Sequence, residues 1–261
     1  MSENDTAGTR EPAGTAVRAK KHISRKPITV ARVISDVLLT GAVFIALFLV
    51  WQLWWTDVVA WQHQAAIMED LGWPTVSEEI ATPETGDPPV LPEFPEGEVW
   101  GTFHVPRWGA DNATPLAAGV DRVRILDALG VGHYPGTAMP GEVGNFSVAA
   151  HRTTFGRPFH FIHELEVGDP VIVRTEEYWY VYRVTHWEIV YPWQVEVVSP
   201  IPGYAPGEDM PEPTERLGSM TSCHPMYSAR QRWITFLEFD YWARAADGIP
   251  REMAEGQGAT P

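Results

Sequence analysis

The sequence predicts an all-β fold, a closed β-barrel of short strands, preceded by a single N-terminal transmembrane helix. β-branched and aromatic residues alternate between residues 171 and 184, which is the period-two pattern of strands. Beyond the membrane-proximal region only residues 119–129 and 157–165 look helical, and many short strands with few helices are typical of a barrel. The expected strands are separated by Gly, Pro and Asp turns and comprise residues 99–105, 143–150, 170–175, 178–191, 195–198, 217–222 and 233–241.

The 261 residues carry a formal net charge of -15, which is unevenly divided. Residues 1–32 hold seven basic and three acidic side chains, and we expect them to form a disordered basic tail in the cytoplasm. The rest of the chain has no lysine and is strongly acidic. Such a domain repels phosphate backbones, so we do not expect it to bind nucleic acid.

The basic tail runs directly into an apolar segment. Residues 37–55 are 19 residues without a charge. As a helix they would extend about 28 Å, enough to cross the hydrocarbon core of a bilayer. Trp51, Trp54 and Trp55 stand at one end of this run, where aromatic rings favour the membrane interface. We therefore assign residues 33–55 to a transmembrane signal-anchor helix at the cell membrane, with the N-terminus in the cytoplasm and the rest of the chain outside. A cleaved signal peptide is the alternative, although the run is long for one.

The segment after the anchor is expected to be a stalk. Residues 57–71 have apolar side chains at three- and four-residue steps, which predicts a short amphipathic helix. The acidic, proline-rich segment 78–98 cannot be a helix or a central strand, so we expect an extended spacer that holds the next domain off the bilayer. With residues 56–98 as stalk and spacer, the folded domain spans residues 99–242, and residues 243–261 form a disordered C-terminal tail.

Cys223 is the only cysteine, and it lies in the part of the chain predicted to face out of the cell. A single exported thiol bridges to another molecule, packs as an inert buried side chain, or is reactive. Cys223 ends an expected strand just before His224 and Pro225, where a thiol is accessible. Nucleophilic use needs a nearby imidazole or cation that favours the thiolate. Arg232, at the start of the next strand, is favoured for that role over Arg230, which we expect in the loop.

Among the nine histidines, His151 has the context of a site residue because it directly follows the expected strand 143–150. His224 is the weaker partner for Cys223, since neighbours on an extended chain point to opposite faces. His133 lies in a turn and either lines a groove or is exposed. The residues alone therefore nominate one imidazole without fixing its role.

Three motifs, in this order, give the chain its resemblance to a known family. They are Gly132-His-Tyr-Pro-Gly-Thr-Ala-Met-Pro-Gly141, Gly144-Asn-Phe-Ser-Val-Ala-Ala-His-Arg-Thr-Thr154 and Thr221-Ser-Cys-His-Pro-Met-Tyr-Ser-Ala-Arg-Gln-Arg232. With the anchor and spacer before them, they resemble the sortases. The His-Arg-Thr-Thr and Cys-His-Pro-x-Tyr-Ser-Ala sequences are most similar to the class E group of actinobacteria. The resemblance covers residues 99–242.

The resemblance implies an eight-stranded sortase-type β-barrel with one or two short helices and a Cys–His–Arg site formed by Cys223, His151 and Arg232. The family pattern before the cysteine is usually Thr-Leu-Thr-Thr-Cys, and Met220 and Ser222 depart from it, which bears on the substrate groove rather than on the chemistry. We expect neither a metal nor a cofactor. The expected substrate-binding positions are Thr221, Ser222, His133 and Tyr134.

The same resemblance implies a membrane-anchored cysteine transpeptidase. Such an enzyme cleaves a C-terminal sorting signal between Thr and Gly through a thioester at Cys223. The signal would be similar to Leu-Ala-x-Thr-Gly or Leu-Pro-x-Thr-Gly, and similarity to class E favours the first. The expected partners are secreted proteins with this signal and a cell-wall amine, from either a lipid II-like peptidoglycan precursor or a pilin lysine. Residues 81–86, Ala-Thr-Pro-Glu-Thr-Gly, resemble such a signal but lack the leading Leu and the hydrophobic tail, so we interpret them as spacer.

Two alternative functions are also compatible with the sequence. One is another exported cysteine peptidase, or an L,D-transpeptidase that acts on peptidoglycan. The His-Gly, Ser-x-Gly-Cys and Asp-Cys-Ser-Gly signatures of those enzymes do not occur in this chain. The other is a non-catalytic, wall-associated binding module in which Cys223 is merely a buried side chain.

Overall fold

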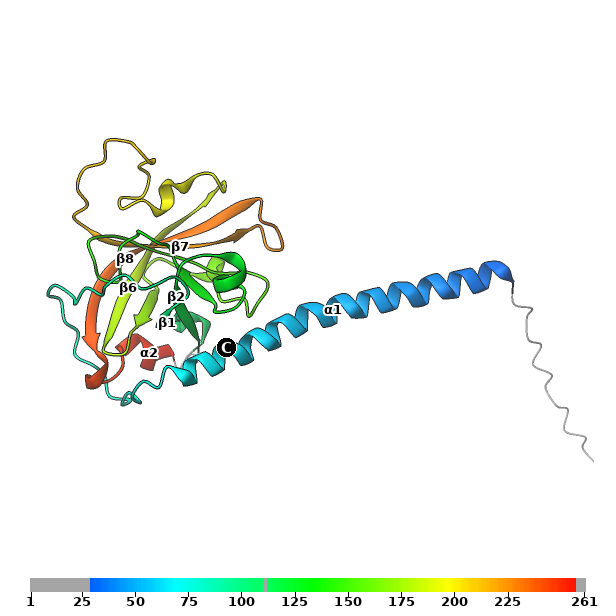
Figure 1. Ribbon diagram of the computed structural model, residues 1–261, viewed down its shortest axis with the longest axis horizontal. Coiled ribbons are helices and arrows are strands. Elements are labelled where there is room, and N and C mark those ends of the chain that lie inside the picture. The colour runs from blue at the N-terminus through cyan, green and yellow to red at the C-terminus, as the bar shows by residue number, and fades with distance from the viewer. Residues whose placement is uncertain (1–28, 110–111, 257–261) are drawn as a thin grey trace, which may run out of the picture. The chain divides into compact units, whose positions relative to one another are not determined.

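The computed structural model describes residues 29–109 and 112–256 (Figure 1). The chain forms two compact units, residues 1–48 and residues 49–261, and each is described by itself. The basic tail predicted for residues 1–32 falls almost wholly outside the described residues.

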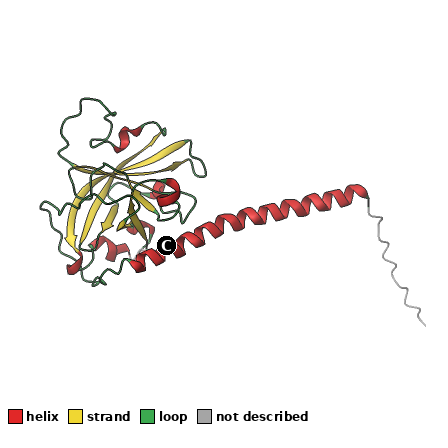
Figure 2. Ribbon diagram, in the orientation of Figure 1, coloured by secondary structure: helices red, strands yellow, loops and turns green. Residues whose placement is uncertain are grey.

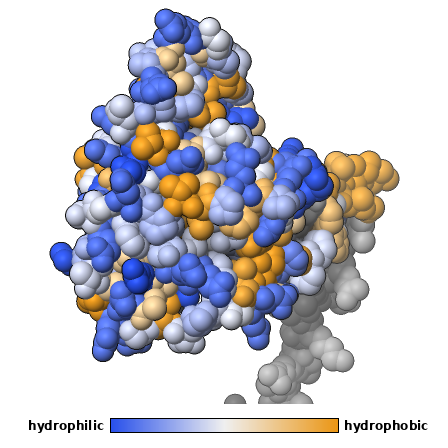
Figure 3. Space-filling model, turned by 60° about the vertical axis from the view of Figure 1, so that its left-hand side comes forward, coloured by the Kyte–Doolittle hydropathy of each residue, from blue (hydrophilic) through white to orange (hydrophobic). Residues whose placement is uncertain are grey.

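The described chain begins with one long helix, α1 (Val30–Asp70). It contains both the predicted membrane segment and the predicted amphipathic helix, with no break between them. Residues 29–50 are exposed throughout, and α1 is the one described helix that is long and apolar enough to cross a membrane. In Figure 3 hydrophobic residues gather on this helix, whereas the visible face of the rest of the chain is mixed. These findings support the predicted membrane anchor.

The described part of unit 49–261 is built around a closed β-barrel with strand order β1-β2-β3-β4-β7-β8-β6-β5. The pairs β2–β3 and β4–β7 are parallel and the other pairs are antiparallel. Figure 2 shows that short helices lie only at the periphery of these strands. The predicted all-β barrel of eight strands is therefore confirmed. The strands are β1 (Val99–His104), β2 (Ala113–Ala118), β3 (Val131–His133), β4 (Gly144–Ala149), β5 (Pro170–Arg174), β6 (Tyr178–Val190), β7 (Arg216–His224) and β8 (Gln231–Arg244).

Aromatic and β-branched side chains fill the barrel. Tyr180 and Tyr182 of β6 pack with Phe103 and Phe146 in one core cluster, and all four are fully buried. A buried hydroxyl needs a hydrogen-bond partner. The Tyr182 hydroxyl accepts the N–H of Gly141 at 2.8 Å, so the polar ends of the core residues also fix the surrounding loops.

Two strands were not predicted, and one predicted strand is not a strand. The β2 sequence is Ala-Thr-Pro-Leu-Ala-Ala and β3 has only three residues, so neither carries a β-branched, period-two signal. Residues 195–198 instead form a short 3₁₀ helix, η4 (Val195–Val198), in the loop between β6 and β7. Helical turns do occur in both segments that looked helical, as η2 (Arg122–Leu126) and η3 (Ile162–Glu164).

The predicted spacer does not stand free of the barrel. Ala81 N donates to Ile249 O at 2.9 Å, and Glu84 exchanges backbone hydrogen bonds of 2.7 and 3.1 Å with Trp242. Phe94 packs against the core and stacks on Trp100. The apolar side chains within this proline-rich segment explain the difference. Their burial favours a segment packed on the barrel rather than a free, extended spacer.

The predicted disordered tail, residues 243–261, is folded as far as the structure describes it. Strand β8 extends to Arg244 and is followed by η5 (Ala245–Asp247) and α2 (Arg251–Gly256), while residues 257–261 lie outside the described residues. Glu252 of α2 is buried, accepts the Tyr241 hydroxyl at 2.5 Å and pairs with Arg183. These contacts attach the C-terminal segment to the barrel. No local sequence pattern predicts them.

Candidate active site

The β7–β8 hairpin places Cys223 beside Arg232. The two residues are direct cross-strand partners, so their side chains leave the same face of the sheet. Thr221, two residues before the cysteine, shares that face, whereas Ser222 points to the other face. The Ser222 hydroxyl is buried and donates to Ala150 O at 2.9 Å. The hairpin therefore fixes a thiol and a guanidinium side by side on hydrogen-bonded strands.

His151 reaches the same place from β4. Strand β4 runs parallel to β7 with Ala149 opposite Thr221, and Ala150 N donates to Thr221 O at 3.3 Å. His151 follows directly, level with the end of β7. It lines a cavity of about 550 Å³ together with Cys223 and Arg232. The structure thus brings all three predicted site residues to one cavity.

Asp127 is the partner of His151 that sequence reasoning missed. Its Oδ1 lies 2.5 Å from Nε2 of His151, and both side chains are largely shielded from solvent. Asp127 ends the helical turn η2, whose first turn is capped by Asp121 through the N–H groups of Val123 and Arg124. Nothing in the sequence links Asp127 to a histidine 24 positions later, because the contact exists only in the folded chain.

The guanidinium of Arg232 is held at the mouth of the hairpin. Its Nη1 donates to Ala229 O at 2.9 Å and to Gln231 O at 3.0 Å. Arg230 is exposed and does not line the cavity. Of the two arginines considered from sequence, the structure brings Arg232 to the thiol.

A second guanidinium, missed from sequence, lies behind the thiol. Arg152 is 4% exposed and stacks over Trp233 at 5.5 Å. Its Nη1 donates to Cys223 O at 3.3 Å and to Nδ1 of His224 at 3.1 Å. Burial and the charge of Arg152 lower the pKa of His224. The His224 ring is therefore bound to Arg152. This agrees with the prediction that His224 is the weaker partner for the thiol.

Three of the four predicted substrate-binding residues line the cavity, and they are Tyr134, Thr221 and Ser222. The Tyr134 hydroxyl lies 2.9 Å from Oγ1 of Thr221, and burial raises its pKa. His133 does not line the cavity. Its ring is buried between Trp100 and Phe146, and burial lowers its pKa to about 4. Substrate binding by His133 therefore has no support in this geometry.

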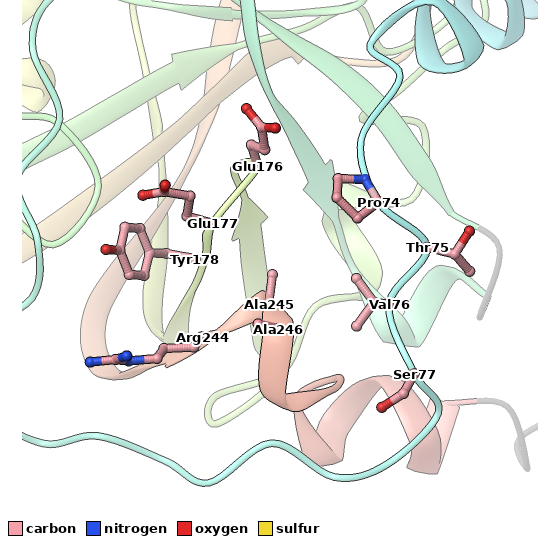
Figure 4. A pocket seen from close by; sticks show the side chains of 10 residues that line it. All are labelled: Pro74, Thr75, Val76, Ser77, Glu176, Glu177, Tyr178, Arg244, Ala245 and Ala246. Carbon is pink, nitrogen blue, oxygen red and sulfur yellow. The ribbon is translucent and has the colours of Figure 1, made fainter.

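Another cavity, of about 390 Å³, lies near the other end of β8 (Figure 4). It is formed by residues 74–77, 176–178 and 244–246. Pro74, Val76 and Ala245 line its apolar part. Its lining residues include neither a cysteine nor a histidine.

Comparison with known proteins agrees with this geometry. Residues 103–239 match the family model described as "Sortase domain". The chain belongs to the sortase family of cysteine transpeptidases. This sortase is 31% identical over 247 residues to Sortase SrtE1 of Streptomyces coelicolor, an alignment that covers 89% of this chain but only 62% of the relative. It is 30% identical over 238 residues to Sortase SrtE2 of the same organism, covering 88% of this chain and 89% of that relative.

Solved sortase structures have the same fold. The SrtA sortase from Actinomyces oris is 37% identical with a TM-score of 0.59, and covers 66% of this chain and 96% of its own. Sortase E1 from Streptomyces coelicolor, solved with a tripeptide in the active site, is 32% identical with a TM-score of 0.53. That match covers 60% of this chain and 97% of the solved one.

Proposed function

We propose that this chain is a membrane-anchored transpeptidase that cuts a C-terminal sorting signal between Thr and Gly and joins the new carboxyl end to a cell-wall amine. The observation that carries the proposal is the convergence of Cys223, His151 and Arg232 on one cavity of about 550 Å³. A thiol, an imidazole and a guanidinium together supply a nucleophile, a proton carrier and an oxyanion donor.

In the first half of the proposed reaction, the thiolate of Cys223 attacks the Thr carbonyl carbon of the signal. Negative charge develops on the carbonyl oxygen, and the Arg232 guanidinium donates hydrogen bonds to it. The C–N bond then breaks as protonated His151 gives its proton to the leaving Gly nitrogen. A thioester between Cys223 and the Thr residue remains.

In the second half, an acceptor amine attacks the thioester carbon. Neutral His151 takes a proton from the amine, Arg232 again meets the oxyanion, and the Cys223 thiolate leaves. One amide bond is broken and one is formed, with no change in oxidation state. His151 changes charge in each half, and the carboxylate of Asp127 at 2.5 Å would orient its ring and stabilise the imidazolium.

The substrate side of the proposal follows the similarity to class E relatives. We assign Leu-Ala-x-Thr-Gly as the favoured signal, with Leu-Pro-x-Thr-Gly as the competitor. Tyr134 and Thr221 are assigned as groove residues, and Ser222 as a residue that lines the groove while its hydroxyl is bound to Ala150 O. The tripeptide in the active site of the Streptomyces coelicolor structure supports a peptide-binding role for the equivalent cavity. The acceptor is a peptidoglycan-precursor amine or a pilin lysine.

The location of the enzyme is part of the proposal. We place residues 33–55 of α1 across the cell membrane, with residues 1–32 in the cytoplasm and the barrel outside. The seven basic residues before the apolar run support this orientation.

The test uses the purified full chain in detergent micelles with quenched-fluorescent Leu-Ala-x-Thr-Gly and Leu-Pro-x-Thr-Gly peptides. We expect cleavage at Thr–Gly, transfer to added triglycine, and a mass-spectrometric adduct on Cys223 that hydroxylamine releases. Cys223→Ala should be folded and inactive. Turnover by that variant, or cleavage of muropeptides in place of sorting peptides, would refute the assignment.

A further inference from the structure

The outer part of α1 packs against the loop that follows His151. Asp57 is 8% exposed, accepts the N–H of Gly156 at 3.1 Å and forms an ion pair with Arg157, with Nε and Oδ2 2.9 Å apart. One turn further on, Trp61 Nε1 donates to Gly156 O at 3.1 Å. The Arg157 guanidinium also lies over the Trp61 ring, 5.8 Å from its centroid. The helix thus holds both backbone polar groups of Gly156.

The loop that α1 holds has an unfavourable backbone. Phe155, Gly156 and Arg157 have φ values of 53°, 80° and 51°, three consecutive residues in the left-handed region. Residues with a Cβ avoid this region, so such a loop persists only where its surroundings stabilise it. The contacts from Asp57 and Trp61 fall at the centre of this strained segment.

The same loop contacts the His151 ring. The Phe155 ring packs against the His151 ring with centroids 5.4 Å apart. The loop closes on itself where Phe159 N donates to His151 O at 3.0 Å. A change in the backbone at Gly156 would therefore be passed to the imidazole through its neighbour Phe155.

α1 also contacts the loop that carries Asp127. His63 Nδ1 lies 3.0 Å from the carbonyl oxygen of Ala128, the residue after Asp127. The buried side chain of Gln64 lies so close to Gly130 that a Cβ there would approach it to 3.2 Å. A cavity of about 350 Å³ between the helix and these loops is lined in part by Asp127. Both members of the His151–Asp127 pair are thus on loops that rest on α1.

We infer that residues 57–64 of α1 form a brace that positions His151 for catalysis, with Asp57 and Trp61 as its central contacts. The inference rests on the proposed function, in which His151 moves the proton. The brace acts on the imidazole rather than on the peptide groove. Loss of the brace should therefore slow turnover and leave substrate affinity unchanged.

The test compares two variants of the full chain in detergent. Asp57→Ala removes the ion pair and the acceptor for Gly156 N–H, and Trp61→Phe removes one donor while keeping an aromatic ring. Because misplacing a catalytic group is costly, kcat should fall about tenfold for Asp57→Ala and about threefold for Trp61→Phe, with KM within about twofold of wild type. Amide hydrogen exchange of residues 151–159, followed by mass spectrometry, should accelerate in the same order.

Two matched variants on the same helix serve as controls. Glu69→Gln removes an exposed carboxylate, and Trp54→Phe changes an exposed indole. Both should keep the wild-type kcat and loop exchange. An unchanged kcat or unchanged loop exchange in Asp57→Ala overturns the brace, as does an equal effect from Glu69→Gln. A wild-type chain that cleaves no sorting peptide overturns the proposed function instead, and the exchange measurement still decides whether α1 holds the loop.

Discussion

The candidate active site has two sides that are held in different ways. Cys223 and Arg232 stand opposite each other on a strand ladder that continues through β7 and β8. His151 stands at the start of a strained loop and depends on Asp127 from another loop and, as inferred, on α1. Cross-strand pairing fixes the first side locally, whereas the second side is assembled from distant parts of the chain. Substitutions far from the cavity should therefore displace the His151 imidazole more than the Cys223 thiol or the Arg232 guanidinium.

The largest effect on turnover is expected at Arg232, on the side of the site formed by β7 and β8, which we call the strand side. Arg232→Ala removes the proposed oxyanion donor and should lower kcat by about 10²–10³. Arg232→Lys keeps the charge but loses the planar fork, so it should fall between Arg232→Ala and wild type. The matched control Arg230→Ala, in the exposed loop next door, should stay within about twofold of wild type. Steady-state peptide cleavage measures all three, and equal losses at the two arginines would contradict the assignment.

The next largest effect is expected at Asp127, on the side of the site that holds His151, which we call the loop side. Asp127→Asn keeps the shape but removes the charge that would stabilise the His151 imidazolium, so kcat should fall about 100-fold with little change in KM. Asp127→Glu should recover part of the loss. Asp121→Ala removes the cap of the same helical turn and should lower stability slightly while largely sparing kcat. If the Asp121 variant lost as much activity, the role of Asp127 would be structural only.

A pH-dependent prediction concerns the barrel interior at His133 of β3, the strand that pairs with β4. His133 is buried with its pKa lowered to about 4, from 6.5 in the unfolded chain. Below pH 6.5 the unfolded chain binds a proton that the folded chain does not, so this residue makes stability fall as pH falls toward 4. Between pH 7 and pH 5 the loss attributable to His133 is about 2 kcal/mol. Denaturation of His133→Asn should show a correspondingly flatter pH dependence, and an unchanged slope would contradict it.

The smallest effect tests the contact between loop and helix. Gly156→Ala places a Cβ at φ +80°, within 3.1–3.3 Å of Gln64 and Trp61. Gly136→Ala has a similar φ of +73° but no atom within 4 Å. Both should lose about 1 kcal/mol of stability from the backbone, with a few tenths more at Gly156. Only Gly156→Ala should also lower kcat, and equal kinetics for the two variants would weaken the distinction between the two sides.

The sequence predicted the strand side better than the loop side. Strands β6 and β8 are long and rich in β-branched and aromatic residues, so their pattern is visible without the fold. The motif around Cys223 and Arg232 is contiguous, which let the family resemblance identify both. His151 was found because its own motif follows β4.

The missed residues act only through tertiary contacts. Asp127 sits in a loop with no motif, and Arg152 contacts Cys223 through a carbonyl oxygen 71 positions away. Strands β2 and β3 were overlooked because Pro, Ala and Gly give no strand signal. Glu252 is ordered by Tyr241 and Arg183, which are 11 and 69 positions distant. In each case the partner, not the local sequence, decides the structure.

The pairing of Glu84 with Trp242 has a consequence for the proposed cleavage of Thr–Gly bonds. The segment Ala-Thr-Pro-Glu-Thr-Gly at residues 81–86 is secured on β8 by two backbone bonds at Glu84 and by the Trp242 indole, which donates to Gly86 O at 3.2 Å. Ten strand positions separate Trp242 from Arg232, roughly 33 Å along an extended chain. To bring Thr85 to the Cys223 thiol, residues 81–86 would first have to separate from β8. With the proposed activity, the fold would thereby keep the protein from cutting between its own barrel and its predicted membrane anchor.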